Sequence, residues 1–169
     1  GLQSGKKIFF VPDRCLGQNF AKSLKLKSAV VGDGSDLKEA DIICYNGFCS
    51  VHQLFDVEDI AFYRAKYPDI LIVTHPECKP EVCALSDFVG STSQIIDYVK
   101  KLPLDQKIAI GTEYNMIKRL RKENTYVLSS SKPECPTMNE TTLQDVYNVL
   151  LSIKEGRFEN EITVSEETR

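Results

Sequence analysis

The sequence lacks the segments that would tie it to a membrane. No stretch approaches the roughly 18 consecutive apolar residues that span a bilayer, and no signal-peptide pattern opens the chain. We therefore expect a cytoplasmic protein with no membrane partner. In that reducing compartment the six cysteines are not expected to form a disulfide framework, which leaves some of them available as metal ligands.

A large block of charge of one sign is also missing. The 169 residues carry a formal net charge of -3, and 27% of them are charged while 42% are hydrophobic. This is the composition of a folded globular chain rather than a disordered one. The absence of a strongly basic block argues against a nucleic-acid partner.

The sequence does not begin with Met but with GLQSGKK. Near its other end, EITV (161–164) predicts a strand, and SEET (165–168) predicts the capped, acidic first turn of a helix. The sequence then stops at Arg169. We expect the chain to be part of a longer protein.

What the sequence does contain is a regular alternation of short apolar runs and segments of helical period. The predicted strands are residues 8–11, 29–31, 41–44, 70–74, 87–90, 107–111 and 125–128. The predicted helices are residues 17–23, 57–66, 91–100, 113–122 and 142–154. Such alternation predicts an α/β fold, in which helices cover both faces of a parallel sheet.

In such a fold, ligands bind beyond the carboxyl ends of the strands. The segments that follow the predicted strands should therefore hold the chemistry. They are VPDR (11–14), CYNGFCSVH (44–52), THPEC (74–78), VGSTS (89–93), GTE (111–113) and SSSKPECPT (129–137).

Two of these segments resemble each other. Residues 49–60 align without gaps on residues 135–146, so that Cys49 matches Cys135 and Asp59 matches Asp145. In both, the cysteine precedes a predicted helix. We interpret this as duplication of a strand–Cys–helix unit, and we expect the two thiols to converge.

Several kinds of site are compatible with Cys49 and His52. Their Cys-x-x-His spacing is that of half a zinc site, although the chain has no CxxC and no CxxCH for a c-type haem. A nucleophilic cysteine with a histidine base is a second interpretation, and a packed thiol is the third. The packed interpretation is the one we adopt for the remaining cysteines, Cys15, Cys44, Cys78 and Cys83.

Two further segments carry polar groups at strand ends. His75 and Glu77 directly follow a predicted strand and could transfer protons or bind a carboxylated substrate, or could simply form a turn around Pro76. Ser91 and Thr92 open a predicted helix, where the first-turn amides favour an anion; ordinary N-capping is the alternative.

Taken together, these segments resemble quinolinate synthase, the iron–sulfur enzyme of de novo NAD synthesis. The matching strings are VPDRCLG, GFCSVHQ, THPEC, DFVGSTSQI, IAIGTE and ECPTMNETTLQDVYNVL. They extend from residue 8 to about residue 164, in the order of the family. Cys15 departs from the pattern, since the family often has Asn there.

The resemblance implies three related α/β/α sandwich domains with parallel sheets around a pseudo-threefold axis. In that architecture residues 1–50 would be the latter half of one unit and residues 51–156 a complete domain. Residues 157–169 would be a return segment toward an N-terminal domain that this chain lacks. That N-terminal part would be a partner of this chain, and a homodimer is compatible with the resemblance.

The resemblance also implies a [4Fe-4S] cluster bound by one cysteine from each domain. Cys49 and Cys135 stand where two of those ligands belong, and the third would lie in the N-terminal part. The reaction implied is the condensation of iminoaspartate with dihydroxyacetone phosphate to quinolinate, with loss of phosphate and water.

By position, Glu77 would be the proton-transfer residue of that reaction. His52 and His75 would orient the substrate, while Ser91 and Thr92 would bind its carboxylate or phosphate. Two alternatives remain open: a cluster-free, truncated binding module that is inactive alone, and a zinc enzyme that uses Cys49, His52, His75 and Cys135.

Overall fold

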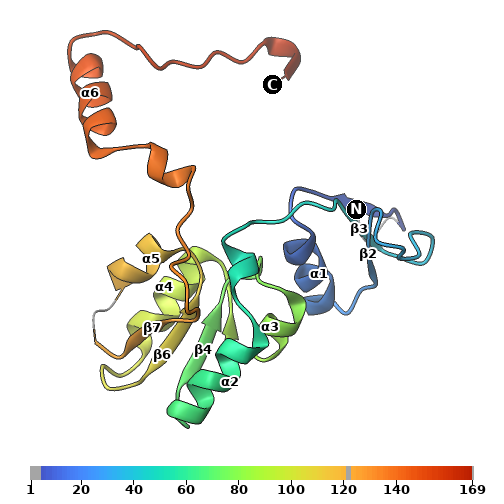
Figure 1. Cartoon of the computed structure of the whole chain (residues 1–169). Helices are drawn as coiled ribbons and strands as arrows, with labels where there is room; N and C mark the ends of the chain where they lie inside the picture. Colours follow the sequence, from blue (N-terminus) through green and yellow to red (C-terminus); the bar gives the residue numbers. More distant parts are fainter. Residues whose placement is uncertain (1–4, 121–122, 169) are drawn as a thin grey trace. The chain divides into compact units, whose positions relative to one another are not determined.

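A computed structural model describes residues 5–120 and 123–168. The chain divides into two compact units, Gly1–Glu134 and Cys135–Arg169, and each is described by itself. The first unit contains all the strands among the described residues, as Figure 1 shows. The domain boundaries expected after residues 50 and 156 stay predictions.

The first unit has the predicted alternation of strands and helices. Its strands are β1 (Ile8–Phe10), β2 (Ser28–Val30), β3 (Ile42–Cys44), β4 (Leu71–Thr74), β5 (Phe88–Val89), β6 (Ile108–Gly111) and β7 (Thr125–Val127). Its helices are α1 (Arg14–Ser23), α2 (Val57–Lys66), α3 (Pro80–Ala84), α4 (Thr92–Lys101) and α5 (Tyr114–Leu120), with a 3-10 helix at His52–Leu54. Every predicted strand of this unit is confirmed, with each end shifted by about one residue at most.

The strands form two parallel sheets. The first has the order β1-β3-β2, and the second has the order β5-β4-β6-β7. In the second sheet Thr74 of β4 lies beside Gly111 of β6 and Val89 of β5, so the carboxyl ends of these strands share one edge. The predicted α/β fold is confirmed.

The second sheet is covered on both faces. Ile72 of β4 packs with Ile60 of α2 and Val82 of α3, whereas its neighbour Val73 belongs to a cluster with Ile95 of α4. Successive residues of a strand point to opposite faces, which explains why a continuous apolar run serves both clusters. Figure 1 shows this sheet between α2 and α3 on one side and α4 and α5 on the other.

The first sheet packs against α1. Ala21 of α1 is buried with Val30 and Cys44 of the sheet, and helix and strand approach closely at Gly17. A Cβ atom at Gly17 would lie 2.6 Å from the Sγ of Cys44, so glycine permits this contact. Cys44 is fully buried, and the packed interpretation is also confirmed for the three other cysteines to which we gave it, Cys15, Cys78 and Cys83.

Two of the predicted helices differ at their ends, and one helix was not predicted. Helix α1 begins at Arg14 rather than at residue 17, because the Asp13 side chain accepts a hydrogen bond from the backbone N–H of Leu16 and caps it. The short α3, which begins at Pro80, was not predicted; proline is favoured at the first position of a helix. The helix predicted over 113–122 is described as Tyr114–Leu120, and residues 121–122 lie outside the described residues.

The second unit contains α6 (Leu143–Lys154) and 3-10 helices at Met138–Glu140 and Glu166–Thr168. The strand predicted at residues 161–164 is wrong: this segment is irregular. A strand needs a neighbour for its backbone hydrogen bonds, and the described residues of this unit include no other strand. The helical turn predicted at residues 165–168 is a 3-10 turn.

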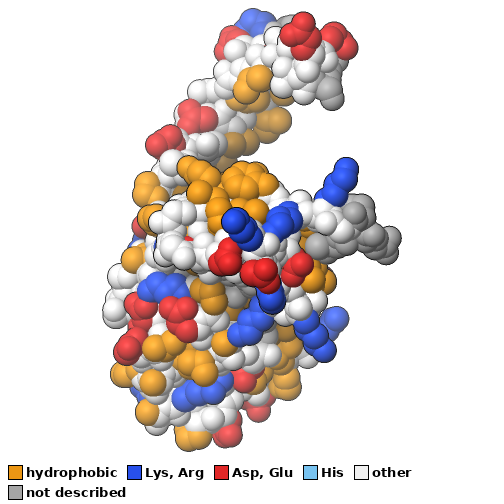
Figure 2. All heavy atoms as spheres, turned by 90° about the vertical axis from the view of Figure 1, so that its right-hand side faces the viewer, with side chains coloured by type: hydrophobic (Ala, Val, Ile, Leu, Met, Phe, Trp, Pro, Cys, Tyr) orange, Lys and Arg blue, Asp and Glu red, His pale blue; other side chains and the backbone are white. Residues whose placement is uncertain are grey.

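The charges on the surface are mixed. On the face shown in Figure 2, basic and acidic side chains are interspersed, as expected of a chain with a small net charge. No helix among the described residues combines the length and the apolar character needed to span a bilayer.

Candidate metal and catalytic site

The loop that carries Cys49 is held by the segment that follows β1. The Asp13 carboxylate accepts a hydrogen bond from the backbone N–H of Cys49 at 2.9 Å, and the backbone N–H of Arg14 donates to Gly47 O at 2.9 Å. A Cβ atom at Gly47 would lie 2.3 Å from Pro12 O, so only glycine allows this approach. These contacts hold Cys49 at the carboxyl edge of the first sheet.

Cys49, His52 and Glu77 come together at this edge. One ligand atom of each, a thiol sulfur, an imidazole nitrogen and a carboxylate oxygen, lies within 4.8 Å of the other two. His52 Nδ1 is 3.0 Å from Glu77 Oε2. The side chains are 8% exposed for His52 and 25% exposed for Glu77, so the group is only partly open to solvent.

Cys49, His52 and Glu77 shift one another's pKa values toward the charged forms. Burial is the largest influence on the pKa of His52 and lowers it, but Cys49 and Glu77 together outweigh burial and raise that pKa to about 9. The neighbouring imidazole of His52 lowers the pKa of the Cys49 thiol, and the same imidazole lowers the pKa of Glu77. In the absence of a metal, this arrangement favours a thiolate and a carboxylate beside an imidazolium.

His75 lies against this group without joining it. Its ring stacks on the ring of His52, with centroids 4.7 Å apart and an angle of 22° between the planes. Its Nδ1 accepts a hydrogen bond from the backbone N–H of Glu77 at 3.3 Å. Burial lowers the pKa of His75, and the charge of His52 adds to this effect, so His75 is the neutral imidazole of the pair.

Helix α1 also fixes the loop that carries His75 and Glu77. Asn19 Nδ2 donates hydrogen bonds to Pro76 O at 2.7 Å and to Cys78 O at 2.9 Å, the carbonyls on either side of Glu77. Because Asp13 holds the Cys49 loop at the start of the same helix, α1 aligns both halves of the site.

Ser91 and Thr92 lie at the start of α4. Ser91 is the N-cap, and it forms a capping box with Gln94, so the N-capping interpretation is confirmed for Ser91. A cavity of about 530 Å³ has Ser91, Pro76 and Asn19 in its wall, which places Ser91 beside the loop of His75 and Glu77. A role in substrate binding stays a prediction for both hydroxyl residues.

Cys135 belongs to the second unit, but its local structure matches that of Cys49. A 3-10 helix begins three residues after each cysteine, at His52 and at Met138. An N-cap with a capping box follows seven residues after each cysteine, at Asp56 and at Thr142, and a helix comes next. The two segments therefore agree in structure as well as in sequence, which supports the duplicated unit; convergence of the two thiols stays a prediction.

The comparisons with known proteins decide the family. The family model of the quinolinate synthetase A protein (NadA) matches residues 1–169. The chain belongs to this family. The resemblance seen in the sequence strings is confirmed.

Curated proteins named quinolinate synthase are similar to this chain over nearly its whole length. The protein from Helicobacter pylori (strain ATCC 700392 / 26695) is 56% identical over 172 residues, which cover 98% of this chain and 51% of that protein. The relative from Rhodopirellula baltica is 34% identical, with 99% of this chain and 47% of that protein covered. The relative from Geobacillus sp. (strain WCH70) is 37% identical, with 94% and 47% covered. The chain thus spans about half the length of the curated relatives it matches.

Sequence reasoning missed three residues that organise the site of this family member. Asp13 and Asn19 act through backbone groups of residues 36 and 57 or more positions away, so no periodic pattern marks them. Thr112, whose Oγ1 lies 3.2 Å from His52 Nε2, was in the segment GTE but had no assigned role. The position of Asp13 before a helix was the one usable signal, since Asp is a preferred N-cap.

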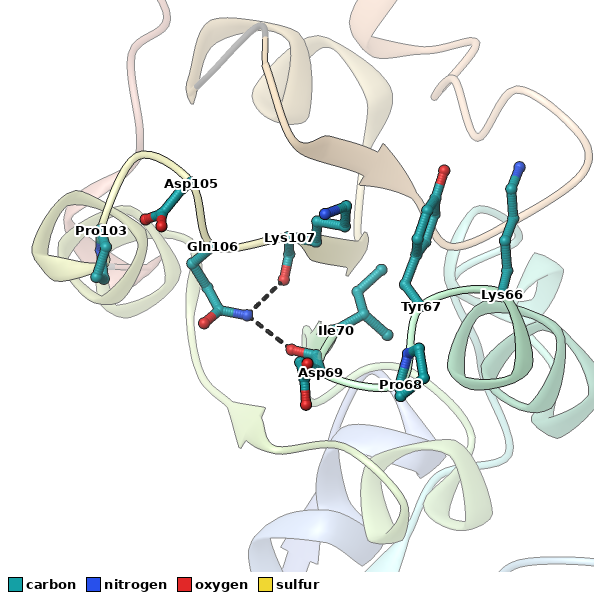
Figure 3. A pocket seen from close by; sticks show the side chains of 9 residues that line it. All are labelled: Lys66, Tyr67, Pro68, Asp69, Ile70, Pro103, Asp105, Gln106 and Lys107. Atoms are coloured by element: carbon teal, nitrogen blue, oxygen red, sulfur yellow. Dashed lines mark hydrogen bonds between the residues drawn. The ribbon is translucent and has the colours of Figure 1, made fainter.

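A second cavity lies at the opposite edge of the second sheet and lacks this chemistry. Figure 3 shows its lining residues, which precede β4 and β6, among them Tyr67, Asp69 and Lys107. Gln106 Nε2 donates hydrogen bonds to Asp69 O at 2.8 Å and to Lys107 O at 3.0 Å, which join residues of the lining (Figure 3). No cysteine or histidine lines it, so the candidate site remains at the carboxyl edge.

Proposed function

We propose that this chain is the latter half of a quinolinate synthase, which condenses iminoaspartate with dihydroxyacetone phosphate to quinolinate and releases phosphate and water. One observation carries the proposal. In a member of this family, a thiol, an imidazole and a carboxylate meet at the carboxyl edge of parallel strands, where α/β folds bind their ligands.

Cys49 and Cys135 would hold a [4Fe-4S] cluster together with a third thiolate from outside this chain. The chemistry of the two residues fits that role. Cys49 is partly exposed and the neighbouring imidazole of His52 lowers its pKa, which favours the thiolate that iron requires. Cys135 is also partly exposed and occupies the same place in the repeated unit. When bound, such a cluster supplies an open iron that acts as a Lewis acid.

The other groups of the site would move protons and orient the substrates. Glu77 is a carboxylate with a lowered pKa, half-buried beside His52, and can accept and return a proton. His75 is neutral and can donate or accept a hydrogen bond to substrate oxygens. Ser91 and Thr92 would bind a carboxylate or phosphate at the start of α4, where backbone N–H groups and the helix dipole favour an anion.

We also propose the partners, the domain architecture and the cellular location of the whole protein. This chain's partners would be the two small substrates and the N-terminal part of the same protein, arranged as three α/β/α domains around a pseudo-threefold axis in the cytoplasm. Residues 1–50, 51–156 and 157–169 would be its share of that architecture, and two copies of the whole protein could form a homodimer.

The test uses the full-length protein that contains this chain, reconstituted with iron and sulfide without oxygen. Cys49→Ala and Cys135→Ala should each abolish the visible absorbance of the cluster and quinolinate production. Cys44→Ala is the control, since Cys44 is a packed thiol. Retention of both cluster and activity by either of the first two variants would reject the ligand assignment. A colourless wild-type protein that binds quinolinate would instead favour the cluster-free binding module.

A further inference from the structure

Cys49, His52 and Glu77 form a set of donors that already has nearly the spacing of a mononuclear metal site. Their ligand atoms lie within 4.8 Å of one another, and Nδ1 of His52 is 3.0 Å from Oε2 of Glu77. In a tetrahedral zinc site with bonds of about 2.0–2.3 Å, neighbouring ligand atoms are about 3.3–3.8 Å apart. Side-chain movements of about 1 Å would therefore complete the site.

The Nδ1 atom of His52 needs a partner. His52 is 6% exposed, and within the described part of the chain Nδ1 makes no hydrogen bond of good geometry. Glu77 Oε2 is near enough, but it lies off the direction that a hydrogen bond from Nδ1 requires, so the contact is electrostatic. A buried nitrogen without a hydrogen bond, next to a thiol and a carboxylate, is in the position of a metal ligand.

Thr112 supports this role from the other side of the ring. Its Oγ1 lies 3.2 Å from Nε2 of His52 and is buried. When a metal displaces the proton of Nδ1, the remaining Nε2–H donates to Thr112 and Nδ1 presents its lone pair toward Cys49 and Glu77. A hydrogen bond at the second nitrogen is the usual support of a metal-binding histidine, because it fixes the tautomer and the ring orientation.

The donor types point to zinc. Thiolate, imidazole and carboxylate are its three common ligands, and three protein ligands leave a fourth position for water. A thiolate and a carboxylate also neutralise a divalent cation, which reduces the cost of holding it in a partly buried place. His75 does not belong to the group whose ligand atoms lie within 4.8 Å of one another, and its Nδ1 already accepts from the backbone of Glu77.

We propose that Cys49, His52 and Glu77 bind one zinc ion with an open fourth position whenever no cluster occupies Cys49. This site needs neither Cys135 nor His75, in contrast to the zinc site considered from the sequence. A consequence that rests on the proposed function is that zinc and the cluster compete for the Cys49 thiolate. Zinc would then block cluster assembly, and its removal would permit it.

The test titrates the purified chain, freed of metal by a chelator, with Co²⁺ as a spectroscopic substitute and then with Zn²⁺. One Co²⁺ per chain should bind, with a thiolate-to-cobalt absorption band and the visible bands of a four-coordinate ion, and Zn²⁺ should displace it. Cys49→Ser should abolish the thiolate band. Glu77→Gln and Thr112→Val should weaken Co²⁺ binding by about 10- to 100-fold.

Cys135→Ala is the matched control and should bind Co²⁺ as the unchanged chain does. Circular dichroism of each variant shows whether the fold is retained, and His52→Gln provides a second ligand variant if Cys49→Ser fails to fold. A Co²⁺ spectrum without a thiolate band, or binding that depends on Cys135 but not on Glu77, would overturn the proposal. Because the titration contains no iron or sulfide, its result is independent of whether the chain contributes to a cluster.

Discussion

The carboxylate of Asp13 joins the start of α1 to the backbone of Cys49. Its Oδ1 accepts from Leu16 N at 2.7 Å and its Oδ2 from Cys49 N at 2.9 Å, and the residue is 4% exposed. One oxygen thus caps the helix, and the other binds the backbone of the loop that carries Cys49. Hydrogen bonds to a buried carboxylate are stronger than those between neutral groups.

We predict that Asp13→Ala costs about 2–4 kcal/mol of the free energy of unfolding, because it removes a cap and leaves the Cys49 N–H without its acceptor. Asp13→Ser should recover about 1 kcal/mol of this, since serine caps helices but is too short to reach Cys49. Urea unfolding measures the free energy of unfolding of both variants. Hydrogen exchange of the Cys49 amide measures the loss of its acceptor. Equal stability of the two variants, or an unchanged rate of exchange at Cys49, would contradict this account.

Asn19 has the same function for the loop of His75 and Glu77. We predict that Asn19→Ala costs about 1–3 kcal/mol, because Pro76 O and Cys78 O lose their donor, and that it speeds hydrogen exchange in residues 75–79. Weaker Co²⁺ binding should accompany the change, since Glu77 lies between these two carbonyls.

Gln106→Ala is the control for Asn19. Gln106 also donates from one amide nitrogen to two backbone carbonyls, but at the opposite edge of the sheet (Figure 3). The Gln106→Ala variant should lower the free energy of unfolding by about as much as Asn19→Ala does. Hydrogen exchange in residues 75–79 and the affinity for Co²⁺ should stay unchanged. If both variants weaken Co²⁺ binding equally, the effect of Asn19 is one of general stability and not of loop position.

Asp13 and Asn19 also show which contacts could not be predicted from the sequence. The apolar runs of β4 and β6 and the capping signals of α2 and α4 are local, so the strands, the helices and the shared edge could be predicted. His75 and Glu77 were found because they directly follow β4, and His52 because it lies in the segment after β3. Asp13 joins the segments that follow two strands of the first sheet, and Asn19 joins α1 to the loop after β4. A single sequence does not encode such contacts in any spacing.

The failure at residues 161–164 has a related cause. EITV has the composition of a strand, but β-propensity describes how a residue fits a sheet rather than an independent preference of the backbone. In the described residues of the second unit no other strand is present to pair with it. The prediction at residues 142–154 succeeded because a capped amphipathic helix satisfies its own backbone hydrogen bonds.

Ser91 allows capping to be separated from ligand binding. We predict that Ser91→Ala costs about 1 kcal/mol of the free energy of unfolding and that Ser91→Asn costs almost nothing, because asparagine is an equally good N-cap. If the hydroxyl also binds a substrate anion, both variants should raise the KM for dihydroxyacetone phosphate or iminoaspartate in the reconstituted full-length protein. A KM that rises only for Ser91→Ala would show that the cap alone matters.

The cysteines should differ sharply in reactivity when neither metal nor cluster is bound. The neighbouring imidazole of His52 lowers the pKa of Cys49, whereas burial raises the pKa of Cys83 to about 11 and that of Cys78 well above the ordinary value. At about pH 7.5 the thiolate fraction falls about tenfold for each unit by which the pKa rises, and only the thiolate reacts with iodoacetamide. We therefore predict that Cys49 is alkylated at least tenfold faster than Cys83 or Cys78, as measured by mass spectrometry of the peptides after timed quenching.

The histidine supplies the control for this prediction. His52→Gln removes the imidazole that lowers the pKa of Cys49, so the alkylation of Cys49 should slow while that of Cys83 stays the same. Raising the pH should then restore the rate at Cys49, because a higher pH compensates for a higher pKa. Alkylation of Cys83 as fast as that of Cys49 in the unchanged chain would show that the first unit opens before it reacts. An unchanged rate at Cys49 in the His52→Gln variant would show that exposure, and not the imidazole, makes this thiol reactive.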